Sequence, residues 1–167
     1  MKSVDTVQSS GHHRRVNPAE AVQLFRLKEH QLDAMRALAG AVNASDLRKV
    51  SVSDEVRDAL IAGASDPYPP VRFGCLQLLD HLADPAVLPA IFRALDDAVP
   101  RVRRLAAHAL GCGICKPTWD GALQPEAVIK LAKLASEDAN KKVRDEARFA
   151  LACWRRRHPR DDPATTR

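Results

Sequence analysis

The sequence predicts an all-α fold: an α-solenoid of stacked helical hairpins with about three clear repeats and a degenerate N-terminal capping unit. Three segments repeat along the chain without gaps, and their apolar residues recur at helical spacing. Only 4% of the 167 residues are aromatic, and alternating runs rich in valine, threonine and tyrosine are absent. This composition disfavours a β-sandwich or a β-barrel.

The first element is the capping unit over residues 17–43, which has a helical period but lacks the repeat signature. Asn17 supplies an N-cap, and Pro18 suits the first helical turn. The period does not decide between one helix and two. Its apolar residues follow mostly at steps of three or four: Val22, Phe25, Leu32, Met35, Leu38 and Val42.

Each clear repeat carries the pattern D-x4-V-R-x2-small-x2-apolar-Leu where its second helix begins. The aligned segments are 66–79, 97–110 and 138–151. From each valine the apolar positions fall at +4, +7 and +8, which line one face of an α-helix and cannot line one face of a strand. The valines are Val71, Val102 and Val143.

A first helix precedes each of these second helices, and its apolar residues recur at fixed distances from the same valines. The positions fifteen residues before the valines hold Val56, Val87 and Val128, and those eleven before hold Leu60, Ile91 and Ala132. Ser53 and Asp84 are the expected N-caps, and Pro85 suits a first turn. Neither helix of such a hairpin can bury its apolar stripe against one partner, so consecutive hairpins are expected to stack on a shared core.

The paired helices, with D-x4-V-R entering the second helix, resemble HEAT repeats in the short form common in bacterial proteins. The resemblance covers residues 53–156. It implies that the repeated aspartates and arginines form a ladder along the stack, and that the second helices line a concave side used for partners. The implied ladder residues are Asp66 and Arg72, Asp97 and Arg103, and Asp138 and Arg144.

These patterns divide the chain into a disordered tail at 1–16, a solenoid domain at 17–157 and a basic tail at 158–167. The repeats are expected at about 53–83, 84–115 and 124–157. The last two are separated by an insertion at 112–123, rich in glycine and proline with Trp119 at its tip, and such insertions often contact partners.

The second helices are predicted to present positions +2, +5 and +6 from each valine to the outside. These positions hold Phe73, Leu76 and Gln77, then Arg104, Ala107 and His108, then Asp145, Arg148 and Phe149. Aromatic residues beside arginine are enriched in protein–protein interfaces, although neighbouring hairpins could instead cover both phenylalanine rings. We therefore expect a non-catalytic scaffold or adaptor that binds another protein. The candidate partner-binding residues are Phe73, Gln77, Arg104, His108, Arg148, Phe149 and Trp119.

The alternative partner is nucleic acid. The net charge is +5, and residues 140–167 hold nine basic and four acidic side chains, so this end alone accounts for the excess. A basic end can bind phosphate without sequence preference. The residues that would carry this role are Arg101, Arg104, Lys141, Lys142, Arg148 and Arg155 to Arg157.

One cluster has the chemistry of a metal site, namely His108, Cys112 and Cys115. Zinc usually needs four ligands, and small residues such as cysteine also suit close helix packing, so we expect no metal and no cofactor. The motifs GxSxG, GxxxxGK[ST] and HExxH are absent, so we expect no enzyme. The repeats are also similar to those of bilin lyases, which leaves a lyase or lyase subunit as a further alternative.

The opening residues lack the apolar run of a secretory signal, and no apolar run approaches the length that spans a bilayer. We therefore expect a cytoplasmic protein with no membrane partner. Its four cysteines are expected to be reduced thiols. They are Cys75, Cys112, Cys115 and Cys153.

Overall fold

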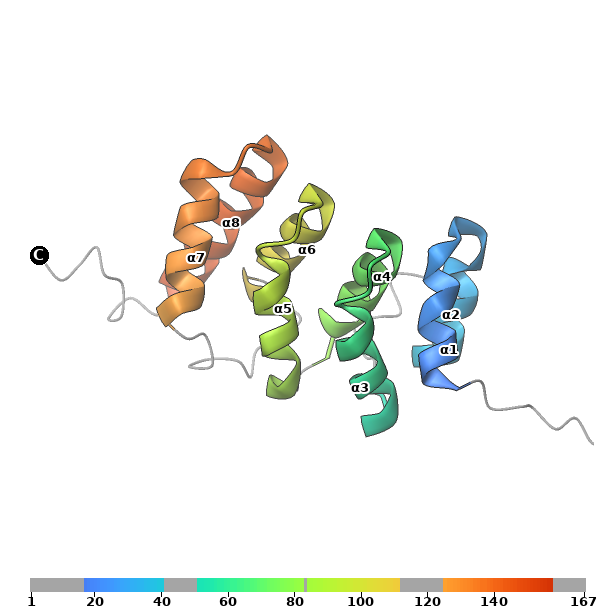
Figure 1. Cartoon of the computed structure of the whole chain (residues 1–167). Helices are drawn as coiled ribbons and strands as arrows, with labels where there is room; N and C mark the ends of the chain where they lie inside the picture. Colours follow the sequence, from blue (N-terminus) through green and yellow to red (C-terminus); the bar gives the residue numbers. More distant parts are fainter. Residues whose placement is uncertain (1–16, 41–50, 83, 112–124, 158–167) are drawn as a thin grey trace, which may run out of the picture.

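The computed structural model describes residues 17–40, 51–82, 84–111 and 125–157, and these residues contain helices and no β-strand. Helix pairs stand side by side in a row from one end of the molecule to the other (Figure 1). The first helices α3, α5 and α7 form one layer, and the second helices α4, α6 and α8 form another (Figure 1). The predicted all-α solenoid is confirmed.

The N-terminal unit consists of two short helices separated by two 3-10 turns. They are α1 (Pro18–Gln23), η1 (Leu24–Arg26), η2 (Lys28–His30) and α2 (Gln31–Ala39). The Asn17 side chain accepts a hydrogen bond from the Ala19 N–H at 2.9 Å, as expected of an N-cap. Gly40 ends α2 with a φ of 66°, the left-handed conformation that favours glycine. Two helices therefore form where the period left the number open.

Three hairpins follow. Their elements are α3 (Asp54–Gly63) with α4 (Pro69–Leu79), η4 (Pro85–Val87) and α5 (Leu88–Ala94) with α6 (Pro100–Gly111), and α7 (Pro125–Glu137) with α8 (Lys141–Arg157). Ser53 caps α3 by accepting from the Val56 N–H, and Asp84 accepts from the Ala86 N–H at 2.9 Å. Both predicted N-caps are confirmed.

The core runs along the row between the two layers. The second-helix valines Val71, Val102 and Val143 are all at most 1% exposed, as the repeat predicts. The first-helix register holds for Leu60 and Ile91, which are fully buried.

The expected register is wrong in α7. Ala132 is exposed, and the buried row is instead Ala127, Leu131 and Ala135. These residues are spaced by four, so they form one ridge on the side of the helix that packs against α8. None of the helices in the described ranges combines the length and apolar character that a bilayer crossing requires.

Two glycines let neighbouring units approach closely. A Cβ added at Gly111 in α6 would lie 2.4 Å from the Cα of Ala150, so only glycine permits this crossing of α6 and α8. A Cβ at Gly74 in α4 would lie 2.3 Å from the Phe25 ring. The N-terminal unit is thus seated on the first hairpin through Phe25, which is 4% exposed.

Candidate partner-binding surface

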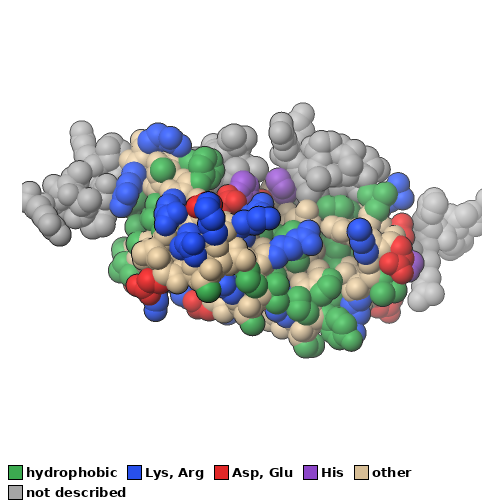
Figure 2. Space-filling view, turned by 90° about the horizontal axis from the view of Figure 1, so that it is seen from above, with side chains coloured by type: hydrophobic (Ala, Val, Ile, Leu, Met, Phe, Trp, Pro, Cys, Tyr) green, Lys and Arg blue, Asp and Glu red, His purple; other side chains and the backbone are tan. Residues whose placement is uncertain are grey.

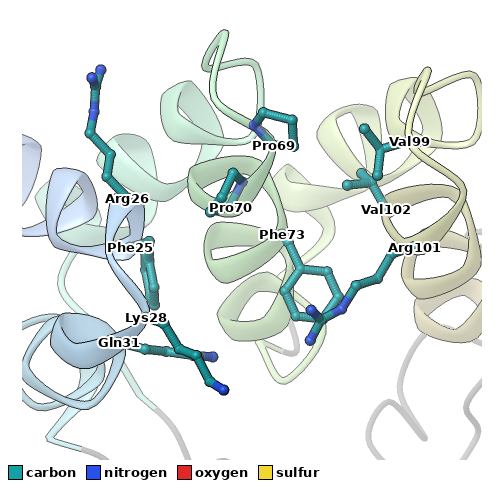
Figure 3. A pocket seen from close by; sticks show the side chains of 10 residues that line it. All are labelled: Phe25, Arg26, Lys28, Gln31, Pro69, Pro70, Phe73, Val99, Arg101 and Val102. Carbon is teal, nitrogen blue, oxygen red and sulfur yellow. The ribbon is translucent and has the colours of Figure 1, made fainter.

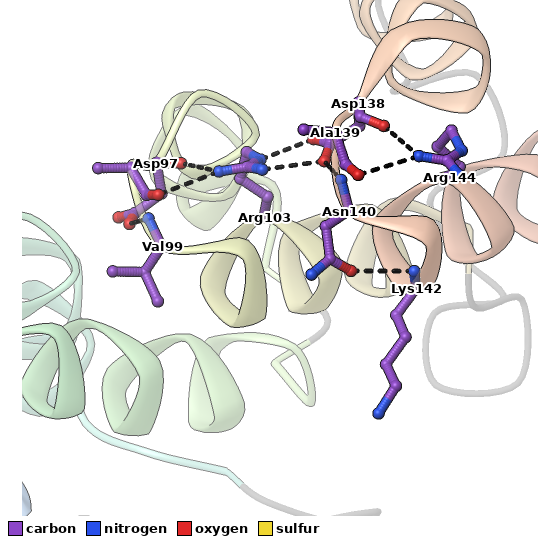
Figure 4. Close-up of polar contacts among 9 residues, drawn as sticks. Asp97, Val99, Arg103, Asp138, Ala139, Asn140, Lys142 and Arg144 are labelled. Atoms are coloured by element: carbon purple, nitrogen blue, oxygen red, sulfur yellow. Dashed lines mark hydrogen bonds and ion pairs between the residues drawn. The ribbon is translucent and has the colours of Figure 1, made fainter.

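Arginine–aspartate pairs join each second helix to the next repeat. Arg72 donates from Nε and Nη2 to the carboxylate of Asp97 at 2.6 and 2.9 Å. Arg103 binds Asp138 in the same way, at 2.7 and 2.9 Å (Figure 4). Two parallel hydrogen bonds fix the relative orientation of the two groups as well as their distance. The ladder implied by the resemblance is confirmed, and it holds successive second helices in register.

The two ends of the ladder differ from its middle. At the N-terminal end, Asp66 accepts a hydrogen bond from Gln23 Nε2 at 3.1 Å, so a glutamine of α1 stands where an inner repeat has arginine. At the other end, Arg144 donates from Nη1 to the carbonyl oxygens of Asp138 and Ala139 (Figure 4). Among the described residues, no carboxylate pairs with its guanidinium.

A groove of about 380 Å³ opens between the N-terminal unit, α4 and α6 (Figure 3). Its apolar lining comes from three consecutive units of the row. These residues are Phe25, Pro69, Pro70, Phe73, Val99 and Val102. Because the ladder keeps the second helices in register, their equivalent positions open toward the same side, and the groove crosses the helices instead of following one of them.

Three cationic side chains, Arg26, Lys28 and Arg101, also line this groove, and none of its lining residues is acidic. The Arg101 guanidinium lies over the Phe73 ring, 3.9 Å from the ring centre (Figure 3). The Arg26 guanidinium lies over the exposed Tyr68 ring in the same way, at 4.3 Å. Such stacking holds an arginine in place. Arg26 also donates from Nε to Gln23 Oε1 at 2.6 Å.

A second hollow of about 260 Å³ continues the groove toward α8, and the two share Phe73 and Arg101. Here Glu146 of α8 lies between two side chains of α6. Its Oε1 is 3.0 Å from His108 Nδ1, and its Oε2 is 3.4 Å from Arg104 Nε. The charge of the surface therefore changes along its length, from cationic beside the N-terminal unit to mixed beside α8.

The structure brings three of the predicted partner-binding residues together, because Phe73, Arg104 and His108 all line this continuous surface. Gln77 lies next to it and accepts a hydrogen bond from Gln31 Nε2 at 3.2 Å. Seen from above, lysine and arginine side chains gather over the half of the molecule that holds α5 to α8, with histidines beside them (Figure 2).

The other predicted residues have different surroundings. Arg148 pairs with Asp145 at 3.2 Å within α8, and Phe149 is 53% exposed and lines neither hollow. Trp119 and the whole predicted insertion lie outside the described residues. The alternative, that neighbouring hairpins cover both phenylalanine rings, is therefore wrong for Phe149.

Position +5 was expected to face outward, and this is wrong in the inner repeats. Leu76 and Ala107 are 1% and 0% exposed, whereas Arg148, at the same position of α8, has a side chain that is 58% exposed. The reason is that α6 packs on α4 and α8 packs on α6. Sequence reasoning missed Phe25, Arg26 and Lys28 as groove residues because the N-terminal unit has no repeat signature to place it.

The possible metal ligand His108 is paired with Glu146, and Cys112 and Cys115 lie outside the described residues. In the part of the chain that the structure describes, no group of three or more His, Cys, Asp or Glu side chains could hold a metal ion.

Comparison with known families agrees with the repeat seen in the structure. A family model for HEAT repeats matches residues 57–152, which is more than half of the chain and includes both inner pairs of the ladder. A search of curated proteins found no match. The protein belongs to the HEAT-repeat family.

Proposed function

We propose that this protein is a non-catalytic adaptor that binds another protein along the surface formed by α4, α6 and the N-terminal unit. The observation that carries the proposal is the continuous groove with Phe73 and Arg101 at its centre. Phenylalanine and arginine are enriched in protein interfaces, where few residues supply most of the binding energy. Proteins built from HEAT repeats commonly mediate protein–protein contacts, which supports this class of function.

Site-specific photo-crosslinking tests the proposal. A photoreactive amino acid replaces Gln77, which lies beside the groove, or Lys133, an exposed residue of α7 that lines neither hollow. Each variant is expressed in the native cell and irradiated. We expect the Gln77 variant to give discrete protein adducts that the Lys133 variant lacks. Adducts of the same pattern from both positions, or from Lys133 alone, would contradict binding through the groove.

Nucleic acid is a second candidate because Arg101 and Arg104 line the surface. Other basic residues of that candidate set have acidic neighbours: Lys141 and Arg148 both pair with Asp145. Binding through about six phosphate contacts would weaken by roughly a thousandfold or more between about 50 and 200 mM salt. Oligonucleotide binding with that salt dependence would favour this candidate, and its absence at low salt would eliminate it.

A further inference from the structure

We propose that the groove binds an extended acidic protein segment that places an apolar side chain against Phe73. This inference rests on the proposed adaptor function and specifies the chemistry of the partner. The charge of the lining, the shape of its apolar floor and the position of Glu146 each support one part of it.

The charge of the groove favours a partner that carries carboxylates. Arg26, Lys28 and Arg101 line it without an acidic neighbour in the lining. Among the described residues, no carboxylate forms an ion pair with Lys28 or Arg101. By contrast, Arg72 and Arg103 are each engaged in the ladder. A bound carboxylate would therefore pair with Lys28 and Arg101 without displacing one of the protein's own, whereas Arg26 already donates from Nε to Gln23 Oε1 at 2.6 Å.

The stacked Arg101 is preorganised for such a carboxylate. The carbon of its guanidinium lies 3.9 Å from the centre of the Phe73 ring. An arginine that stacks on an aromatic ring keeps the N–H donors at its edge available for hydrogen bonds. A carboxylate can accept two parallel hydrogen bonds from that edge. Because stacking already limits the motion of this side chain, less conformational entropy is lost on binding.

The floor of the groove favours an apolar anchor beside the carboxylates. Phe25, Phe73 and the two consecutive prolines Pro69 and Pro70 form it, and Gly74 leaves the space that seats the Phe25 ring against α4. A volume of about 380 Å³ is at the small end of ligand pockets, which suits one or two side chains of a peptide.

The bound segment is expected to be extended and to place its acidic residues at one end of the surface. The groove crosses from the N-terminal unit over α4 to α6 and then continues into the hollow beside α8. At that far end, Glu146 already neutralises Arg104 and lies against His108. The acidic residues of the segment should therefore lie over Arg26, Lys28 and Arg101, and its neutral residues should lie over α6 and α8.

A displayed library of short random peptides tests this proposal, with the full chain as the immobilised target. Selection is run on the native sequence, on Arg101→Glu and on Lys133→Glu, a matched charge reversal on an exposed α7 residue that lines neither hollow. Circular dichroism and a thermal melt show that each variant is folded. Enriched peptides are synthesised with a fluorophore, and their dissociation constants are measured by anisotropy.

We expect native protein to enrich peptides in which aspartate or glutamate flanks an aromatic or aliphatic residue. Arg101→Glu should weaken their binding by about tenfold or more, whereas Lys133→Glu should leave it unchanged. Phe73→Ala should also weaken the binding of these peptides, although it changes no charge in the groove or in the peptide. Enrichment without an acidic preference, equal effects of the two charge reversals, or no enrichment at all would overturn the proposal.

The same experiment separates this inference from the adaptor function. Neutral peptides that bind and crosslink at Gln77 would overturn only the acidic specificity and leave groove binding intact. Crosslinks in cells that arise only from Lys133 would overturn the proposed function, which is binding of a protein along the groove. A labelled oligonucleotide that competes with the selected peptides at low salt would assign the cations to nucleic acid and overturn the acidic-segment proposal.

Discussion

Arg103 binds Asp138 through two parallel hydrogen bonds, and this pair joins α6 to the turn that leads into α8. The Asp138 side chain is only 3% exposed, and the Arg103 side chain is 15% exposed. Arg103 also donates to the carbonyl oxygens of Asp97 and Ala98 in its own repeat. A single guanidinium therefore links the loops of two consecutive hairpins, so its loss should affect the stacking of the repeats more than the stability of either helix.

Replacing Arg103 by methionine should lower the free energy of unfolding by about 3 kcal/mol, because the buried Asp138 carboxylate would lose its partner. Urea denaturation measures this change. Arg144→Met is the matched control, since Arg144 makes the same kind of bonds to two carbonyl oxygens and has no described carboxylate partner. It should cost about 1 kcal/mol. Equal losses in the two variants would show that the ion pair contributes nothing to stability.

The ladder should also make the protein sensitive to acid. The hydrogen bond from Arg103 is the main cause that lowers the pKa of Asp138 below its ordinary value. Burial raises the pKa of Asp97, but the hydrogen bonds from Arg72 and the Val99 N–H outweigh burial and lower it overall. A carboxyl group with a lowered folded-state pKa stabilises the fold above its unfolded pKa of about 3.9, and this stabilisation is lost as the pH falls through the folded-state pKa.

The free energy of unfolding should therefore decrease as the pH falls below about 5, which denaturation at a series of pH values measures. The double variant Asp97→Asn with Asp138→Asn should be less stable at neutral pH, and its stability should depend less on pH in the acidic range. An unchanged acidic slope in that variant would show that other carboxyl groups cause the acid sensitivity.

The resemblance to HEAT repeats implies the ladder, because the aspartate and arginine positions that form it in that family recur in each repeated segment of this sequence. Arg72 and Asp97 come from different repeats, yet each occupies a position that the pattern defines. The buried row of α7 could not be predicted, because Val128, Leu131 and Ala132 allow two apolar rows of helical spacing. Packing of α7 against α8 decides between them, and no residue within α7 records that choice.

The groove was only partly predictable for the same reason. Phe73 was identified from its position in α4, but the wall opposite it comes from the N-terminal unit. The sequence predicted Phe25 as an apolar helical position without indicating what it contacts. Its seat exists because Gly74, in a different unit, has no side chain. A contact between a glycine and a distant ring leaves no periodic signal, so sequence patterns alone do not reveal it.

The contact between Gly74 and Phe25 should appear as energetic coupling. Gly74→Ala places a methyl group where the Phe25 ring lies, so it should destabilise the native protein by about 1–3 kcal/mol. In a Phe25→Ala background that space is empty, and the same change should be neutral or stabilise the helix by about 0.5–1 kcal/mol. A double-mutant cycle by urea denaturation measures the difference. Additive effects would show that the ring and the α4 backbone do not meet in solution.

Cys75 should be unreactive in the folded protein. Burial, together with the smaller effect of the negative charge of Asp66, raises the pKa of its thiol to about 12. At pH 8 the thiolate, which is the form that reacts with disulfide reagents, would be only on the order of one part in ten thousand. Cys153 is only partly buried, so it should react in the folded state.

A variant with Cys112→Ser and Cys115→Ser isolates these two thiols for titration with a chromogenic disulfide reagent. We expect a single thiol to react under native conditions, with both reacting after addition of denaturant. Replacing Cys153 by serine should then abolish the fast reaction of the folded protein. Only the slow reaction of Cys75 should remain, and its rate reports opening of the core around α4. Fast reaction of Cys75 in that variant would mean that α3 and α4 are not packed together as the structure shows, since the Cys75 sulfur lies 2.5 Å from where a Gly63 side chain would begin.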